Sequence, residues 1–168
     1  ERGHKIAIVG TNGIGKTTLL KSLLGLIKPY SGTVHQGDYL EIGYFEQETS
    51  GDNGRTCLEE IWQEFPSWNQ YEVRSALAKC GLTTKHIESQ VRVLSGGEQA
   101  KVRLCKLMNR QSNVLILDEP TNHLDADAKD SLLTALKEYK GSILMVCHER
   151  EFYEALGAQI WDCSRFCR

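Results

Sequence analysis

The sequence predicts an α/β fold in which a mostly parallel sheet is flanked by helices and carries an inserted helical subdomain. Short apolar runs of strand length alternate with leucine stripes at helical spacing. Alternation of this kind implies parallel strands joined by right-handed crossovers, with ligands bound beyond the carboxyl ends of the strands. The alternation stops at about residues 49–111. We therefore expect one domain over residues 1–168, with a core of residues 1–48 and 112–168.

The first half of the chain contains two predicted strands and the start of the helical insert. Residues 5–9 form a β-branched run that ends in glycine, the pattern of a buried strand. Residues 16–26 carry leucines at helical spacing, and a proline three residues later bars continuation. Residues 39–46 alternate like a strand, and a polar loop follows at 48–55. The stretch 56–89 keeps a helical spacing throughout, so we expect it to be entirely helical.

The second half returns to alternating elements. In chain order we expect a helix over 96–110, a strand over 113–117, a helix that Asp125 caps and Gly141 closes, a strand over 142–147, a short helix from His148 and a strand over 158–163.

Composition excludes several classes of protein. The formal net charge of −2 gives no broad basic field for nucleic acid or an anionic membrane. The apolar runs are far shorter than the roughly 20 residues that span a bilayer, and the polar first residues predict no signal peptide. Among six cysteines, Cys105 and Cys147 fit small core residues, whereas Cys163 and Cys167 are a weaker candidate for a metal or redox pair. A reducing, cytoplasmic setting fits this cysteine usage best.

Residues 10–17 match the phosphate-binding pattern G-x-x-x-x-G-K-[ST] between a predicted strand and a predicted helix. The glycines let successive backbone N–H groups face phosphate oxygens, and the helix N-terminus adds partial positive charge. Lys16 is expected to reach the β- and γ-phosphates, and the Thr17 hydroxyl to ligate Mg²⁺. A glycine-rich turn without a ligand is disfavoured because the pattern and its flanking elements agree. The expected nucleotide-binding residues are Gly10, Asn12, Gly13, Gly15, Lys16, Thr17 and Thr18.

Two adjacent carboxylates, Asp118 and Glu119, end an apolar run, and Pro120 forbids the strand from continuing. A buried parallel strand can deliver such a pair to one edge of a sheet. Alone they could equally be surface carboxylates. Beside a phosphate loop, Asp118 fits an acid that holds Mg²⁺, and Glu119 fits the catalytic group that orients or deprotonates the attacking water.

Two further polar residues follow predicted strands. The amide of Gln47 could contact Mg²⁺ or the catalytic water, and His148 ends the apolar run at 142–147. Taken alone, a solvated glutamine and a helix-capping histidine are the simpler interpretations. Their assignment as catalytic residues depends on the neighbouring motifs.

Residues 94–99 read Leu-Ser-Gly-Gly-Glu-Gln at the start of the long predicted helix. Ser95 and Glu98 have the spacing of a capping box. Gly96 and Gly97 each weaken a helix by about 1 kcal/mol relative to alanine, so the pair indicates that something approaches the backbone closely. A helix N-terminus is suited to phosphate, yet one phosphate tail already has its loop at residues 10–17. We therefore expect this helix start to serve a nucleotide held by another domain.

In this order the motifs resemble an ATP-binding-cassette (ABC) nucleotide-binding domain, a P-loop NTPase, over essentially the whole chain. The resemblance implies binding of ATP and Mg²⁺, hydrolysis to ADP and phosphate, and two ATP molecules sandwiched between two cassettes. It implies that Ser95 and Gly97, within the signature 94–98, contact the γ-phosphate on a partner cassette. It also places Asp125 at the dimer seam and has His148 contact the γ-phosphate in cis.

The segments 120–125 (Pro-Thr-Asn-His-Leu-Asp) and 148–152 (His-Glu-Arg-Glu-Phe) are similar to the ABC-F subfamily, and 44–47 is similar to its second cassette. Members of that subfamily are soluble, carry two cassettes and act on ribosomes and tRNA in translation or antibiotic resistance. The resemblance implies a cytoplasmic protein without membrane insertion. Its partner would be a second cassette, either a missing N-terminal half or a second copy.

Family members carry some tens of residues before the first strand, which predicts a C-terminal cassette lacking its start. Two alternatives remain open. One is the ATP-binding subunit of a membrane transporter, which would need a groove for a coupling helix around residues 56–89. The other is a truncated nucleotide-binding module with little activity alone.

Overall fold

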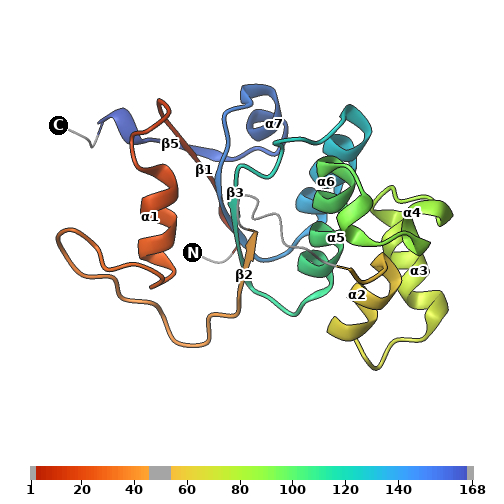
Figure 1. Ribbon diagram of the computed structural model, residues 1–168. Helices are drawn as coiled ribbons and strands as arrows, with labels where there is room; N and C mark the ends of the chain where they lie inside the picture. Colours follow the sequence, from red (N-terminus) through yellow and green to blue (C-terminus); the bar gives the residue numbers. More distant parts are fainter. Residues whose placement is uncertain (1–2, 46–53, 166–168) are drawn as a thin grey trace. The chain divides into compact units, whose positions relative to one another are not determined.

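The computed structural model describes residues 3–45 and 54–165 (Figure 1). The chain divides into two compact units. The sheet unit comprises Glu1–Gln47, Gln111–Pro120 and Tyr139–Arg168, and the helical unit comprises Glu48–Arg110 and Thr121–Glu138.

A five-stranded sheet forms the sheet unit, in the order β2-β3-β4-β1-β5 with every neighbouring pair parallel. The strands are β1 (Lys5–Val9), β2 (Ile42–Phe45), β3 (Val114–Asp118), β4 (Ser142–Val146) and β5 (Gln159–Asp162). The helices of this unit are α1 (Lys16–Leu23), α7 (Arg150–Ala155) and the 3₁₀ turn η2 (Cys163–Arg165). The predicted parallel α/β architecture is therefore confirmed.

The strand register brings three chain segments to one edge of the sheet. Val146 of β4 lies opposite Ile8 of β1 on one side and Asp118 of β3 on the other. The loop after β1 therefore begins beside the carboxyl ends of β4 and β3. This is the edge where parallel sheets bind ligands.

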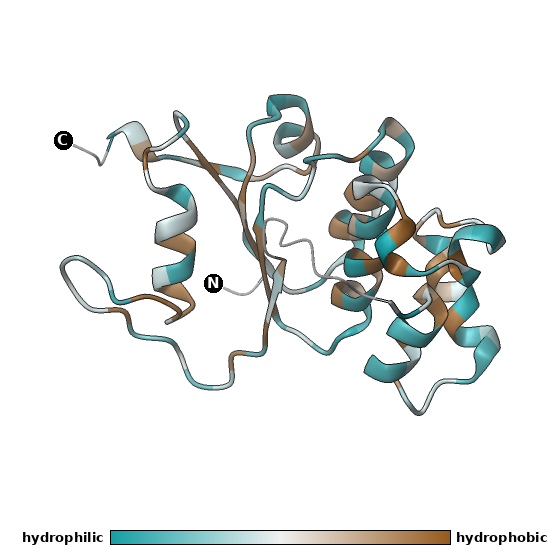
Figure 2. Cartoon of the chain, viewed as in Figure 1, coloured by the Kyte–Doolittle hydropathy of each residue, from teal (hydrophilic) through white to brown (hydrophobic). Residues whose placement is uncertain are grey.

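Helix α1 covers the sheet and ends earlier than expected. Leu20 is fully buried in an apolar cluster with Ile8 and Val146, and β1 is mostly brown, that is hydrophobic, in Figure 2. The helix stops at Leu23 rather than at residue 26 because Gly25 adopts φ +74°. The Gly25 N–H then donates to the Ser22 carbonyl and the Leu26 N–H to the Lys21 carbonyl, which closes a Schellman motif.

The second strand also differs from its expected range. β2 begins at Ile42 and not at Tyr39, because Tyr39 has φ +65°, outside the extended region. The Asn113 side chain holds this approach by donating to the Tyr39 carbonyl at 2.7 Å and accepting from the Glu41 N–H at 3.0 Å. The start of β2 is therefore set by a residue 70 or more positions away.

Within the described residues, the helical unit contains six short or medium elements. These are α2 (Cys57–Glu64), α3 (Gln70–Lys79), α4 (Thr84–Glu88), the 3₁₀ turn η1 (Val91–Val93), α5 (Gly96–Asn109) and α6 (Ala126–Glu138). All of them except α6 contribute side chains to one apolar core. The core includes Ile61, Val73, Leu77 and Cys105, all fully buried. Arg110 Nε, just after α5, lies 2.6 Å from Glu64 Oε1 of α2.

The stretch 56–89 is not one continuous helical region. Phe65 and Trp68 stack at 4.5 Å between α2 and α3, and Gly81 adopts φ +79° between α3 and α4. Each new helix restarts with its own capping box, at Thr56, Asn69 and Thr83. The capping residues therefore divide the stretch 56–89 into three helices, a division that the spacing of apolar residues did not indicate. Within the described residues, no helix is long and apolar enough to cross a membrane.

Candidate functional site

The loop between β1 and α1 has the backbone that a phosphate cradle requires. Gly10, Gly13 and Gly15 all have positive φ, and Gly15 precedes the first turn of α1 in a left-handed conformation. A Cβ added at Gly13 or Gly15 would meet no other atom within 4 Å. The loop thus leaves open space beside Gly13 and Gly15 at a helix N-terminus, where an anion is favoured.

The Lys16 ammonium is enclosed by this loop. Its side chain is almost fully buried, and Nζ donates to the carbonyl oxygens of Gly10 at 3.0 Å and Thr11 at 2.9 Å. These bonds hold a cation inside the loop, where it can meet phosphate oxygens. Asn12 of the loop and Thr18 of α1 are exposed beside it.

Thr17 and Asp118 meet across the sheet edge. The Thr17 hydroxyl donates to Asp118 Oδ1 at 3.2 Å, and Asp118 is fully buried at the end of β3. A hydroxyl and a carboxylate supply the hard oxygen ligands that Mg²⁺ prefers. The donor set therefore fits a magnesium ion bound beside the phosphate loop.

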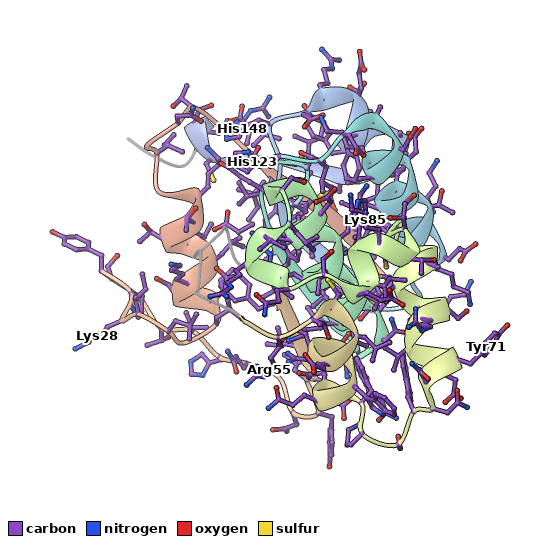
Figure 3. All side chains as sticks on the ribbon, turned by 45° about the vertical axis from the view of Figure 1, so that its right-hand side comes forward. Lys28, Arg55, Tyr71, Lys85, His123 and His148 are labelled. Carbon is purple, nitrogen blue, oxygen red and sulfur yellow. The ribbon has the colours of Figure 1, made fainter. Side chains whose placement is uncertain are left out.

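Glu119 leaves the sheet in a strained conformation. Its φ is +50°, which is unfavourable for a residue with a side chain, and its N–H donates to the Val146 carbonyl at 3.0 Å. Its Oε1 lies 3.1 Å from Nε2 of His148, which follows β4 (labelled in Figure 3). The strand ends thus place a carboxylate and an imidazole in hydrogen-bond contact. His148 lies two residues before the start of α7, because Glu149 is extended and the helix starts at Arg150.

The start of α5 is a complete capping box. Ser95 Oγ accepts from the Glu98 N–H at 3.3 Å, and Glu98 Oε2 accepts from the Ser95 N–H at 2.9 Å. The backbone hydrogen bond from Ser95 holds the pKa of Glu98 below its usual range. Gly96 is the first residue of the helix and Gly97 the second. The segment thus presents a helix N-terminus fixed by its own side chains.

Gly97 has a structural requirement that the sequence alone did not reveal. A Cβ at this position would lie 2.6 Å from the carbonyl oxygen of His123, which has φ +63°. Such a distance is too short for any side chain. The segment before α6 therefore packs directly on the backbone of α5.

Asp125 caps α6 and contacts α5. Its Oδ1 accepts from the Ala128 N–H at 2.8 Å, and this backbone bond is the main cause of a lowered pKa of Asp125. Its Oδ2 lies 3.4 Å from Nζ of Lys101, which is almost fully buried in α5. Sequence reasoning missed Lys101. The available signal was a lysine on the apolar face of the helix, between Ala100 and Leu104.

The structure groups the expected residues by unit. Lys16, Thr17, Asp118, Glu119 and His148 gather at one edge of the sheet unit. The helical unit carries the signature residues together with Asp125. Gln47 lies outside the described residues, as does Cys167.

The family model described as "ABC transporter" matches residues 1–122. The curated relatives include the "Uncharacterized ABC transporter ATP-binding protein YfmM" of Bacillus subtilis, which is 66% identical over 98% of this chain. "ABC transporter F family member 5" of Arabidopsis thaliana is 39% identical over 99% of the chain, and "ATP-binding protein Uup" of Escherichia coli is 37% identical over 95%. The chain spans 32%, 25% and 26% of these relatives.

Solved structures share the fold. A structure titled as the complex of an archaeal ribosomal stalk protein with the archaeal ribosome recycling factor aABCE1 superposes with a TM-score of 0.82 at 27% identity. The match covers 96% of this chain and 32% of that chain. A dimeric ATP-binding cassette bound to ADP and phosphate has a TM-score of 0.79 at 21% identity, covering 96% and 82%, a likeness in fold alone.

Proposed function

The chain belongs to the ABC transporter family, and from this premise we propose that it binds ATP with Mg²⁺ and hydrolyses it as one cassette of a pair. The observation that carries the proposal is the contact between Thr17 and Asp118 at 3.2 Å, beside the contact between Glu119 and His148 at 3.1 Å. A hydroxyl–carboxylate pair and a carboxylate–imidazole pair therefore lie at the edge of the sheet where the phosphate loop begins.

Each residue of this edge has a defined task in the proposal. The glycine-rich backbone and Lys16 hold the phosphates, with the lysine neutralising charge on the β- and γ-phosphates. Thr17 and Asp118 hold Mg²⁺, which when bound neutralises charge developing on the transferred phosphoryl group. Glu119 orients the attacking water and accepts its proton, because it is the carboxylate that leaves the sheet edge. His148 fixes Glu119 from the next strand and contacts the γ-phosphate.

The proposal requires a second cassette. The start of α5, at Ser95 and Gly97, presents a capped helix N-terminus, which favours an anion. The phosphate loop of the sheet unit already provides a place for the phosphates of one nucleotide. The signature would therefore meet the γ-phosphate of a nucleotide on a partner cassette, with Asp125 at the seam between the two.

The experiment is a measurement of the ATPase rate of the chain against its own concentration. If the reaction needs two cassettes, the rate per molecule rises with protein concentration until the pair is saturated. A rate per molecule that stays constant over a hundredfold range of concentration would contradict the requirement for a pair. No ATPase activity at any concentration would favour a nucleotide-binding module instead.

We further propose that this ATPase acts on the ribosome, in translation, within the cytoplasm. The relatives named as F-family ABC proteins and the ribosome recycling factor among the structural neighbours support this assignment. The test is co-sedimentation of the chain with purified ribosomes, with and without ATP, against co-sedimentation with membrane vesicles. Enrichment on ribosomes that depends on ATP supports the proposal. Enrichment on vesicles alone would favour a transporter subunit.

A further inference from the structure

Helices α4 and α5, which are labelled in Figure 1, each begin with a capping box, and one side-chain contact joins the two boxes. In the first box, Thr83 Oγ1 accepts from the His86 N–H, and His86 Nδ1 accepts from the Thr83 N–H, each at 3.4 Å. In the second box, Ser95 and Glu98 exchange the corresponding bonds. The link between them is His86 Nε2, which lies 3.2 Å from Glu98 Oε1.

The hydrogen bonds of His86 define which ring nitrogen carries the proton. Nδ1 faces the Thr83 N–H and accepts from it, so Nδ1 is unprotonated. In the neutral ring the proton is then on Nε2, which donates to Glu98 Oε1. The imidazole thus acts as acceptor for one helix start and donor to the other.

Both oxygens of the Glu98 carboxylate are occupied as a result. Oε2 accepts from the Ser95 N–H at 2.9 Å, and Oε1 accepts from His86. About a quarter of each side chain, His86 and Glu98, is exposed, so solvent screens the pair only in part. The carboxylate that caps α5 is therefore fixed from two sides, once by its own helix and once by α4.

We propose that His86 is a positioning residue for the signature: through Glu98 it holds the Ser95 backbone in the geometry that receives a nucleotide phosphate from a partner cassette. This inference rests on the proposed function, because Ser95 is assigned to that phosphate there. His86 itself contacts no nucleotide in this scheme. It acts through one carboxylate.

Two substitutions at position 86 separate the link from the local cap. Glutamine and glutamate are both accepted at the third position of a capping box, because either side-chain carbonyl oxygen can accept from the Thr83 N–H. Glutamine also has an N–H₂ group that can donate to Glu98. Glutamate instead places a second negative charge against it. His86→Gln thus keeps both contacts, whereas His86→Glu keeps the cap of α4 and breaks the link.

The first measurement is hydrogen exchange of single backbone amides by NMR. We expect His86→Glu to speed exchange of the Ser95 N–H by about tenfold or more, since its carboxylate partner is released. Exchange of the Thr83 N–H should stay unchanged, and His86→Gln should resemble the unaltered chain at both amides. Unchanged exchange at Ser95 in the glutamate variant would overturn the link. Equal loss at Thr83 would show a merely local defect of α4 and would also overturn it.

The second measurement tests whether the contact between His86 and Glu98 affects the pairing of cassettes. It uses chains that carry Glu119→Gln, so that ATP is bound but not hydrolysed. Sedimentation with ATP should show self-association of the parent and of His86→Gln. The affinity of self-association should be about tenfold weaker in His86→Glu. Binding of a fluorescent ATP analogue to the phosphate loop should be the same in all three. Equal association in all three would overturn the role of His86 and leave the proposed pairing intact. If the parent itself never associates with ATP, the proposed pairing fails, and the role of His86 fails with it.

Discussion

The carbonyl oxygen of His123 occupies the space into which a side chain on Gly97 would project, 2.6 Å from the ideal Cβ position. This contact joins the segment before α6 to the first turn of α5. It gives Gly97 a packing role that is independent of any nucleotide. The fold of the helical unit therefore requires glycine at position 97 of the signature.

Gly97→Ala should lower the free energy of unfolding by up to about 2 kcal/mol. Overpacking against a backbone carbonyl costs about 1–3 kcal/mol, and the better helix propensity of alanine returns about 1 kcal/mol. Urea unfolding followed by circular dichroism measures the difference. Gly37→Ala is the control, because a Cβ there meets no atom within 4 Å. Unchanged or increased stability of Gly97→Ala would show that the His123 carbonyl can move away without cost.

The elements best predicted from sequence are those that carry their own start and stop signals. β1 matches its expected range of residues 5–9, and α5 differs from its expected range by one residue. The stretch 56–89 was expected to be entirely helical, and the structure has three helices there, separated by turns at 65–69 and 80–83. Asn69 and Thr83 each start a new capping box within this stretch. Both capping residues are visible in the sequence, but the prediction was based on the spacing of apolar residues alone.

The geometry of the site was predictable within local motifs and where the ends of parallel strands bring two motifs together, as for Thr17 and Asp118 at 3.2 Å. The glycines of residues 10–15 allow the positive φ angles of the phosphate loop. The end of strand β3 places Asp118 and Glu119 at one edge of the sheet. The contacts between Lys101 and Asp125, and between His86 and Glu98, join residues from different helices. No pattern in a single sequence marks such pairs, because they depend on how the helices pack.

Glu119→Gln should reduce ATP turnover by about a hundredfold or more while leaving ATP binding unchanged. The amide cannot accept the proton of the attacking water, and loss of a general base costs about 10²–10⁴ in rate. The substitution keeps the shape of the side chain and a polar group next to His148 Nε2, which lies 3.1 Å from Oε1. Phosphate release and binding of a fluorescent ATP analogue are measured on the same preparation. Normal turnover in the variant would remove Glu119 from the chemistry.

Thr17→Val should abolish the increase in ATP affinity that Mg²⁺ produces. Valine has the same shape without the hydroxyl that contacts Asp118 at 3.2 Å, so one oxygen ligand is lost. We expect ATP affinity in Mg²⁺ to fall by about tenfold, and affinity in excess EDTA to change little. Thr17→Ser is the matched control because it retains the hydroxyl. If the valine variant keeps its full response to Mg²⁺, Thr17 is not a ligand of the metal.

Lowering the pH should destabilise the start of α5, because Glu98 becomes protonated. Its pKa is lowered in the folded protein, chiefly by the backbone hydrogen bond from Ser95. The carboxylate therefore contributes stability that is fully present above the ordinary glutamate pKa of about 4.3 and is lost as the pH falls through the lowered folded value. Glu98→Gln preserves the capping box without a titrating group, because glutamine is accepted at that position. Unfolding free energies measured between pH 3 and pH 6 should then fall less steeply with acid in the glutamine variant than in the unaltered chain. Parallel pH profiles for the two proteins would show that Glu98 does not titrate with folding.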